Sequence, residues 1–509
     1  MISDLIEPEQ ANIQPFECIS VNYEDIYVHI EPYRINSMQH GILNNETICA
    51  LSTPAGTGAI SVIRISGKDA IKYIDRIFFP ASSGEKQIRE VKSHTLHFGE
   101  IRDDDETIDQ AVVGVFREPN SYTGEDVIEI SCHGSEYIQQ RILQLLTEHG
   151  ARLARPGEFT LRAFLNNKMD LSQAEAVADL IYSNSKAAHD LAMNQMRGYY
   201  SERIRELRQK LIHVASLLEL ELDFSEEDVE FADRREIHEL LDEITGETER
   251  LSQSFSMGNV IRKGIPVAIV GKPNVGKSTL LNAILNEEKA IVSEIPGTTR
   301  DAIEDTIIIG GIAFRFIDTA GLRESRDSIE TIGIERTHEK IRQAKVILYV
   351  FDAGATEFSE ISETLAEFRE FLDREMEAED PKFFIPIANK TDLLVESPKD
   401  FKSMVEIDIL FVSAKRKENI NLIIDKLSEY VKKSAVSDET VVSNARHYEA
   451  LSRAGASIAA VKKGFQENLP TDLITSDMRN ALHYLGEITG EITTNEILDN
   501  IFSRFCIGK

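Results

Sequence analysis

The chain has 509 residues, 42% of them hydrophobic, which at about 150 residues per domain allows about three domains that each bury a core. Its 56 basic residues stand against 86 acidic ones, and the net charge of −30 argues against a general attraction to nucleic acid, so any contact with RNA must be local. No apolar run reaches the roughly 18 residues that span a bilayer, and the N-terminus lacks a secretory signal. We therefore expect a cytoplasmic location and no membrane partner. The four cysteines have no paired spacing, which predicts neither a disulfide framework nor a zinc site.

The first structured region is predicted over residues 45–165. Residues 47–66 alternate β-rich runs with a Pro/Gly turn, and "TIDQAVVGVF" and "EDVIEISCHG" repeat this strand-and-turn pattern. The pattern predicts an α+β domain. Residues 1–44 do not share it, and we expect there either a disordered extension or an incorrect start, with Met38 as the candidate first residue.

Long helices are predicted next, over residues 166–258. There is no proline between Gly157 and Pro266, and apolar residues recur at spacings of three and four, which is typical of amphipathic helices. The two stripes are Ile204, Leu207, Leu211, Val214 and Leu218, and then Ile237, Leu241, Ile244 and Leu251. The stretch "MGNVIRKGIP" after them predicts a linker, because it contains glycines and a proline.

Residues 259–433 show a different pattern, in which short apolar strands alternate with helical stretches. The strands are "IPVAIV", "FRFID", "VILYVFD", "FFIPIAN" and "DILFVSA". This alternation predicts a doubly wound parallel α/β sheet. The helical pattern resumes over residues 434–509. The simplest arrangement is a nucleotide-binding domain inserted into a helical domain, whose parts 166–258 and 434–509 pack together.

The stretch "GKPNVGKST", residues 271–279, has the Gly-x4-Gly-Lys-Ser spacing of a phosphate-binding loop and lies between a predicted strand and a predicted helix. Backbone N–H groups and the helix N-terminus are expected to hold the phosphates. Lys277 is expected to neutralise β- and γ-phosphate oxygens, and the Ser278 hydroxyl to bind Mg²⁺.

Four further elements follow in order at successive predicted strand ends. They are "GTTRD" with Thr298 and Thr299, "DTAG" (Asp318 to Gly321), "NKTD" (Asn389 to Asp392) and "SAK" (Ser413 to Lys415). The first two are expected to sense the γ-phosphate and Mg²⁺. The Asp392 carboxylate can accept from guanine N1–H and the exocyclic amine, which adenine does not offer together. The set therefore predicts a GTP-binding switch.

The residue after "DTAG" carries further information. Ras-like GTPases place a water-orienting Gln there, whereas this chain has Leu322, which cannot orient water. The acidic segment that follows offers other groups to position the water, namely Glu324, Asp327 and Glu330. An arginine finger from Arg323 or Arg326 is a further alternative. The residues themselves do not choose among these.

One basic cluster offers a local contact with RNA. Its members are Arg152, Arg155, Arg162 and Lys168. A solvated helix face is the stronger interpretation of such a cluster. Cys506 has no adjacent base in the sequence, so we interpret it as a small half-buried residue rather than a nucleophile.

Several stretches together resemble the MnmE family, also called TrmE, of tRNA-modification GTPases. Besides "GTTRD", they are "PAGTGAISVIRISG", "SYTGEDVIEISCHG", "RPGEFTLRAFLNNKMDLSQAEAVADLI", "DTAGLRE" and "FCIGK". The resemblance covers about residues 46–509, and it is specific because the motifs outside the GTPase region are not those of GTPases in general. Departures are few: Ser135 and Asn167 stand where the family often has other residues, and residues 1–44 lie outside the pattern.

The resemblance implies a tetrahydrofolate-binding and dimerisation domain over residues 45–165, followed by a helical domain with the inserted GTPase. It implies a homodimer that works with an FAD-containing partner, MnmG. Together they would add an aminomethyl or carboxymethylaminomethyl group to C5 of the wobble uridine of certain tRNAs. The one-carbon donor would be 5,10-methylene-tetrahydrofolate, and 5-formyl-tetrahydrofolate would bind the same site. The implied folate contacts are Arg64, Glu129, Lys168 and Lys509.

The resemblance also extends the nucleotide site. The implied GTP-binding residues are Asn274, Val275, Gly276, Lys277, Ser278, Thr279, Ser293, Glu294, Ile295, Pro296, Gly297, Thr298, Thr299, Asp318, Thr319, Ala320, Gly321, Asn389, Lys390, Asp392, Ser413, Ala414 and Lys415. Mg²⁺ would bind Ser278 and Thr299. A K⁺ ion in place of an arginine finger would bind Asn274, Ser293, Ile295 and Thr298. Glu330 aligns with the water-positioning glutamate of the family, and Glu330 and Lys277 are the implied catalytic residues.

Two other classes of function compete with this interpretation. An RNA-binding GTPase switch in ribosome assembly would need no modification chemistry, but the sequence shows no KH-like basic module. A dynamin-like membrane GTPase would need a lipid-binding segment, and no such segment is evident.

Overall fold

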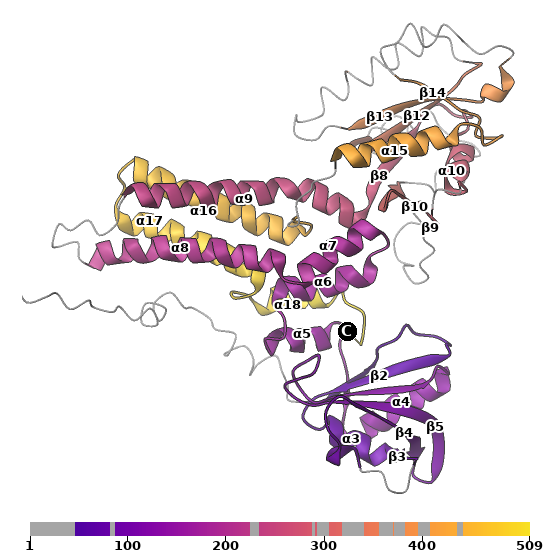
Figure 1. Cartoon of the computed structure of the whole chain (residues 1–509), viewed down its shortest axis with the longest axis vertical. Helices are drawn as coiled ribbons and strands as arrows, with labels where there is room; N and C mark the ends of the chain where they lie inside the picture. The colour runs from indigo at the N-terminus through magenta and orange to yellow at the C-terminus, as the bar shows by residue number, and fades with distance from the viewer. Residues whose placement is uncertain are drawn as a thin grey trace, which may run out of the picture.

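The computed structural model describes several stretches of the chain. They are residues 46–81, 87–223, 234–287, 291–292, 305–317, 341–355, 370, 382–394, 408–434 and 441–508. These stretches form an N-terminal sheet with its helices, an elongated body of helices, and a second sheet that follows helix α9 (Figure 1). The extension predicted over residues 1–44 lies outside the described residues.

Seven strands build the N-terminal sheet, in the order β3-β4-β5-β6-β2-β1-β7. Their bounds are β1 (Ile48–Leu51), β2 (Ile60–Ser66), β3 (Phe78–Pro80), β4 (Thr95–Asp103), β5 (Glu106–Phe116), β6 (Val127–His133) and β7 (Arg152–Leu153). Neighbours are antiparallel, except that β1 and β7 are parallel. Alternate apolar residues of the strands share one core with helices α3 (Ala70–Ile77) and α4 (Glu136–Glu148). The predicted α+β domain is confirmed.

Helices make up the middle body. They are α5 (Glu158–Leu165), α6 (Leu171–Tyr182), α7 (Lys186–Met196), α8 (Tyr199–Asp223), α9 (Arg234–Lys263), α16 (Ala445–Gln466), α17 (Thr471–Thr489) and α18 (Asn495–Phe502). The two predicted apolar stripes lie on α8 and α9, and all their residues are buried. They share one core with α16 and α17, so the two parts of the helical domain pack together, as predicted. No helix in the described stretches is long and apolar enough to cross a membrane.

The prediction of a linker at "MGNVIRKGIP" is wrong, because α9 continues through this stretch to Lys263. The first helical part therefore extends past residue 258. Gly258 is inside the helix, where a Cβ atom would stand 2.1 Å from the carbonyl oxygen of Val442, so this glycine allows a close approach of two segments. Only Gly264, with φ 85°, separates α9 from the next strand. The other predicted domain boundaries stay predictions.

The second sheet has the order β14-β13-β12-β8-β11-β10-β9. Its elements are β8 (Ile265–Val270), β9 (Ile291–Val292), β10 (Asp305–Ile309), β11 (Ile312–Phe316), β12 (Val346–Asp352), β13 (Phe383–Asn389) and β14 (Leu410–Phe411), with helices α10 (Lys277–Leu285) and α15 (Ile420–Ser434). The five strands from β14 to β11 are parallel. Alternate residues of β8 enter different cores: Val267 enters one, and Ala268 the other. The doubly wound α/β prediction is confirmed.

Candidate functional site

The predicted phosphate-binding loop connects β8 to α10 and requires glycine at both ends. Gly271 leaves the strand with φ 148°, and Gly276 precedes the helix with φ 96°. A Cβ atom would stand 2.0 Å from Val350 O at the first and 2.4 Å from Asn389 Nδ2 at the second. A larger residue would therefore displace the Val350 backbone at the first position or the Asn389 side chain at the second.

Lys277 at the start of α10 lies across its own loop. Its ammonium donates to the carbonyl oxygens of Gly271 and Lys272, at 2.8 Å each. These neutral acceptors hold the cation at the helix N-terminus, where a phosphate would meet it. Asn274, at the tip of the loop, has φ 62°, a left-handed conformation that Asn tolerates better than most residues.

Asn389 at the end of β13 joins the phosphate-binding loop to the predicted base-binding loops. Its side chain is buried, with Nδ2 donating to Val275 O at 2.8 Å and Oδ1 accepting from Ala414 N–H at 3.0 Å. One amide therefore fixes the first and last GTP-binding motifs relative to each other. Asn389 is one of the predicted GTP-binding residues, and in the structure it bridges these two motifs.

Asp392 and Ser413 meet beside this amide. The Ser413 hydroxyl donates to Asp392 Oδ1 at 2.7 Å, and this hydrogen bond lowers the pKa of the Asp392 carboxyl. The carboxylate is thus ionised and acceptor-only, as guanine recognition requires. Lys390 instead pairs with Asp352 at the end of β12, at 2.8 Å.

The predicted folate contacts Arg64 and Glu129 face each other across strands β2 and β6. They are register partners, and Arg64 Nε and Nη2 both donate to Glu129 Oε1, at 2.9 and 2.8 Å. The guanidinium also lies over the ring of Tyr122, 5.1 Å from its centroid, and near the ring of Phe159 at 5.7 Å. The arginine is therefore held on several sides.

The C-terminal segment reaches the same place. Gly508 O accepts from Arg64 Nη1 at 3.4 Å and from the Ser52 hydroxyl at 3.2 Å. Gly508 has φ 94°, and a Cβ atom there would stand 2.2 Å from Leu51 O, so glycine permits this approach. Lys509 lies outside the described residues, but the residue before it touches Arg64.

Lys168 follows helix α5 and is tied to the loop before β6. Its ammonium donates to Pro119 O at 2.9 Å. The same loop carries Tyr122, whose ring lies beneath Arg64. Residues predicted from widely separated parts of the sequence are thus brought to one region of the N-terminal domain.

Comparisons with known proteins fit this arrangement. A sequence model of the MnmE helical domain matches residues 171–506, and one of the "GTP-binding protein TrmE N-terminus" matches residues 47–168. The chain is 53% identical over 470 residues to the "tRNA modification GTPase MnmE" of Flavobacterium psychrophilum, which covers 92% of this chain and 100% of that protein. Proteins of the same name from Flavobacterium johnsoniae and Bacteroides fragilis are 52% and 49% identical, again over 92% of this chain and 100% of theirs.

The chain belongs to the MnmE family. The resemblance inferred from the motifs is confirmed. We call Arg64, Glu129, Lys168 and Gly508 the Arg64 region. In this MnmE-family chain the nucleotide site and the Arg64 region lie in different bodies, joined by the helical domain (Figure 1).

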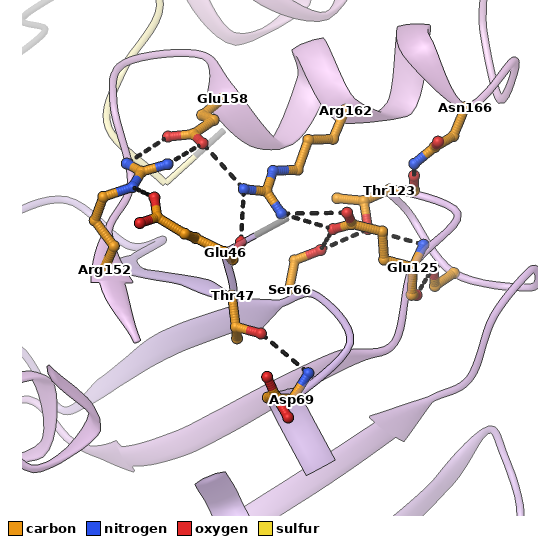
Figure 2. A network of polar contacts seen from close by, with 11 residues as sticks. Glu46, Thr47, Ser66, Asp69, Thr123, Glu125, Arg152, Glu158, Arg162 and Asn166 are labelled. Carbon is orange, nitrogen blue, oxygen red and sulfur yellow. Dashed lines mark hydrogen bonds and ion pairs between the residues drawn. The ribbon is translucent and has the colours of Figure 1, made fainter. Parts of the chain in front are cut away.

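The basic cluster noted in the sequence does not form one solvated helix face in this MnmE-family chain: Arg155 and Lys168 are exposed outside helices, whereas Arg152 and Arg162 pair with carboxylates (Figure 2). Arg162 is only 1% exposed and bonds to Glu125 and Glu158. Arg152 pairs with Glu46 at 2.9 Å and with Glu158 at 2.5 Å. Burial raises the pKa of Glu158, but hydrogen bonds from Arg152 and from the backbone outweigh it and hold that pKa below its usual range. Both arginines are paired with carboxylates, and neither offers an unpaired charge to RNA.

Two metal ions were predicted. The described candidates Ser278 and Asn274 offer neutral oxygens, which suit Mg²⁺ and K⁺ when phosphates complete the shell. Within the described residues, no group of three or more His, Cys, Asp or Glu side chains could hold a metal ion. Several predicted residues lie outside the described ones: residues 293–299 and 318–321, and Glu324, Asp327 and Glu330.

No motif in the sequence predicts Tyr122, Phe159 or Glu125 as site residues. Their relation to Arg64 follows from strand pairing and from the packing of α5, which no local motif reports. Cys506 was expected to be half-buried, which is wrong: it is exposed, and its sulfur lies 3.1 Å from the Tyr182 hydroxyl.

Proposed function

We propose that this chain is a GTP-hydrolysing tRNA modification enzyme. With an FAD-containing MnmG partner it would add an aminomethyl or carboxymethylaminomethyl group to C5 of the wobble uridine, with methylene-tetrahydrofolate as the one-carbon donor. One observation carries this proposal. The chain that holds a GTPase loop also holds an Arg64–Glu129 pair, completed by its own C-terminal segment.

At the nucleotide site, backbone N–H groups of the loop and the N-terminus of α10 bind the phosphates. Lys277 exchanges the carbonyl oxygens of Gly271 and Lys272 for phosphate oxygens. Asp392 accepts from the guanine edge, and Asn389 keeps that carboxylate and the phosphate loop at a fixed separation.

Mg²⁺ and K⁺, when bound, would offset the charge that develops on the phosphates during transfer. Ser278 and Thr299 are the proposed Mg²⁺ ligands. The proposed K⁺ ligands are Asn274, Ser293, Ile295 and Thr298. Glu330 is the proposed group that orients the attacking water, since Leu322 has no polar atom for that role.

At the folate site, the Glu129 carboxylate would accept hydrogen bonds from the amino-substituted edge of the pterin ring. The two Arg64 donors already share one oxygen of that carboxylate, so the other oxygen stays open toward a ligand. Lys168 and Lys509 supply the charges for the glutamyl carboxylates. This assigns Arg64 to orienting Glu129 rather than to the glutamyl tail.

We also propose a homodimer in the cytoplasm with tRNA as substrate. The decisive experiment is mass spectrometry of wobble uridines in a bacterial strain that lacks its own MnmE-family protein and expresses this chain. Restoration of the C5 modification is expected, and loss of it with Glu129→Gln. Restored growth without any C5 modification would favour instead a GTPase switch in ribosome assembly.

A further inference from the structure

The loop of residues 119–125 lies between β5 and β6, and α5 together with the residues after it holds this loop at four points. Thr160 Oγ1 and the Tyr122 hydroxyl are 2.9 Å apart, and Asn166 Nδ2 donates to Thr123 O at 2.7 Å. Lys168 Nζ donates to Pro119 O at 2.9 Å. The fourth point is an ion pair between Arg162 and Glu125, drawn with Thr123 and Asn166 in Figure 2.

The ion pair is the centre of a network in which Arg162 is buried and Glu125 is partly buried. Arg162 Nη1 donates to both oxygens of Glu125, at 3.2 and 3.0 Å, and Nη2 donates to Glu46 O at 2.9 Å and Glu158 Oε1 at 3.1 Å (Figure 2). Glu125 also accepts from the Ser66 hydroxyl at 2.6 Å. Ser66 ends β2, the strand that carries Arg64. The network therefore ties the loop to the strand of the proposed folate site.

The energetics of this network favour a role other than stability. A fully buried guanidinium pays a large desolvation cost, and the Nε of Arg162 has no hydrogen-bond partner. Replacement of buried ion pairs by apolar residues is often neutral or stabilising in proteins. What the Arg162–Glu125 pair does supply is a fixed position for the loop.

That position matters because the loop shapes the proposed folate site. Tyr122 lies in the middle of the loop, and its ring lies under the Arg64 guanidinium that orients Glu129. Pro119, at the start of the loop, holds the Lys168 ammonium. Displacement of the loop would change the distance between the group that reads the pterin and the cation that meets the glutamyl tail.

We propose that Arg162 and Glu125 are positioning residues for the proposed folate site. They set the spacing between the Arg64–Glu129 pair and Lys168. The inference rests on the proposed folate function, because the ligand is taken to be a reduced folate. Neither residue touches the ligand. Both act through the loop of residues 119–125.

The test measures the affinity of the full-length protein for 5-formyl-tetrahydrofolate by calorimetry, in wild type and in Arg162→Met, Arg162→Lys and Glu125→Gln. Displacement of the loop should cost the ligand at least one hydrogen bond to a charged group, so we expect Arg162→Met to lower folate affinity by about tenfold or more. Arg162→Lys keeps the charge but cannot hold two carboxylates, and it should recover part of the affinity. GTP affinity should stay at the wild-type value in all three variants.

Arg203→Met is the matched control. Arg203 also bridges two carboxylates, Glu247 at 2.6 Å and Glu206 at 2.7 Å, but on helices α8 and α9 of the helical domain. It should leave folate affinity unchanged. If Arg162→Met does not fold, Arg162→Lys and Glu125→Gln still decide the question.

The outcomes separate two ideas. Absence of folate binding by the wild type would contradict the proposed function and this inference with it. Wild-type binding with unchanged affinity in the variants would overturn the positioning role alone. Parallel losses of folate affinity, GTP affinity and melting temperature would show that Arg162 only stabilises the fold, and this would also overturn the role.

Discussion

The nucleotide site and the Arg64 region are built in different ways. The phosphate-binding part of the nucleotide site is made largely of backbone in one short loop, with glycines at its ends where a Cβ atom would stand 2.0 to 2.4 Å from a neighbour. The Arg64 region is assembled from separate segments: side chains of β2, β6, the loop of residues 119–125, and α5 with the residues after it, together with the backbone carbonyl of Gly508. A site formed by the backbone of one loop depends on a few neighbouring residues. A site formed by groups from distant segments also depends on the contacts that hold those segments together.

The two regions also differ in charge balance. The Lys277 ammonium donates to neutral carbonyl oxygens of its own loop, which phosphate oxygens would replace in the proposed function. Arg64 is already paired with Glu129 at 2.8 Å. A ligand there must bring hydrogen-bond donors for the carboxylate as well as acceptors for cations. These contrasts predict where each region is most easily broken.

The largest effect is expected from Asp392→Asn. Guanine offers two donors to this carboxylate, its N1–H and its exocyclic amine. The asparagine side chain would place its own N–H donor opposite one of them, and no hydrogen bond can form there. A site that hydrogen-bonds a polar group of its ligand can prefer that ligand by a factor on the order of 10⁴ over one that leaves the site's polar group unpaired. GTP affinity should therefore collapse, and affinity for xanthosine triphosphate should rise, because xanthine offers a carbonyl where guanine has its amine. Nucleotide titration with a fluorescent analogue measures both.

Asp408→Asn is the control for this change. Asp408 lies in the same domain, is largely exposed, and pairs with Lys426 on α15 at 2.9 Å. Exposed ion pairs contribute little to the stability of a protein, so this substitution should leave GTP affinity within about twofold of wild type. Wild-type GTP affinity in Asp392→Asn would show that the base binds elsewhere.

The second effect concerns hydrolysis. Glu330→Ala should slow single-turnover GTP hydrolysis by about 10²-fold while leaving GTP affinity near wild type, because a water-positioning group acts in the transition state. Replacing K⁺ by Na⁺ at equal ionic strength should likewise lower turnover more than affinity. Asn274→Gly should reduce the response to K⁺, since glycine keeps the φ of 62° but has no side-chain oxygen.

Two results would contradict this second prediction. Equal rates in KCl and NaCl would remove the monovalent cation from the mechanism. Unimpaired hydrolysis in Glu330→Ala would return the water-positioning role to Glu324, Asp327 or a residue of another subunit.

The contrast between the two regions explains what could be predicted from sequence. The phosphate loop and Asp392 could be predicted because each motif sits at a strand end, where a parallel sheet brings it to one edge. Arg64 and Glu129 could be named only by resemblance, since their pairing depends on the register of β2 and β6. Arg162 was interpreted as part of a solvated face because its partner Glu125 lies 37 residues away in the chain.

The linker prediction at Gly258 is wrong for a related reason. Gly258 was interpreted as part of a linker, on local propensity alone. Its function in the fold is to admit the carbonyl of Val442, a contact between segments 184 residues apart (442 − 258). Local patterns predict an element, but contacts between distant segments decide whether a glycine ends it.

A third prediction tests the assembled character of the Arg64 region. Deleting residues 505–509 removes the Gly508 carbonyl from Arg64 and Ser52, and also the buried Phe505. Folate affinity should fall by about tenfold or more, the scale of one lost charged hydrogen bond. GTP affinity should not change. Deletion without loss of folate affinity would show that the C-terminal segment only packs against the domain.

The smallest effect is expected from pH, through the helical domain that carries this C-terminal segment. His447 on α16 is buried against Glu175 on α6, with Nε2 and Oε2 2.7 Å apart, so the pair joins the two sequence-distant parts of the domain. Burial lowers the pKa of His447, and Arg446 adds to this, although Glu175 opposes it. Because the unfolded chain takes up its proton near the ordinary pKa of 6.5 and the folded chain only at lower pH, the free energy of unfolding should fall as the pH drops below about 6.5.

Urea unfolding at about pH 7.5 and about pH 5.5 measures that loss in wild type and in His447→Gln, which can still donate to Glu175 but does not titrate. The midpoint should move less in the variant than in the wild type, and an equal shift in both proteins would assign the pH dependence to other groups. Since the helical domain delivers Gly508 to Arg64, acid should weaken folate binding more in the wild type than in His447→Gln. GTP binding depends on a loop that is complete within its own sheet, so its affinity should respond to acid equally in the two proteins.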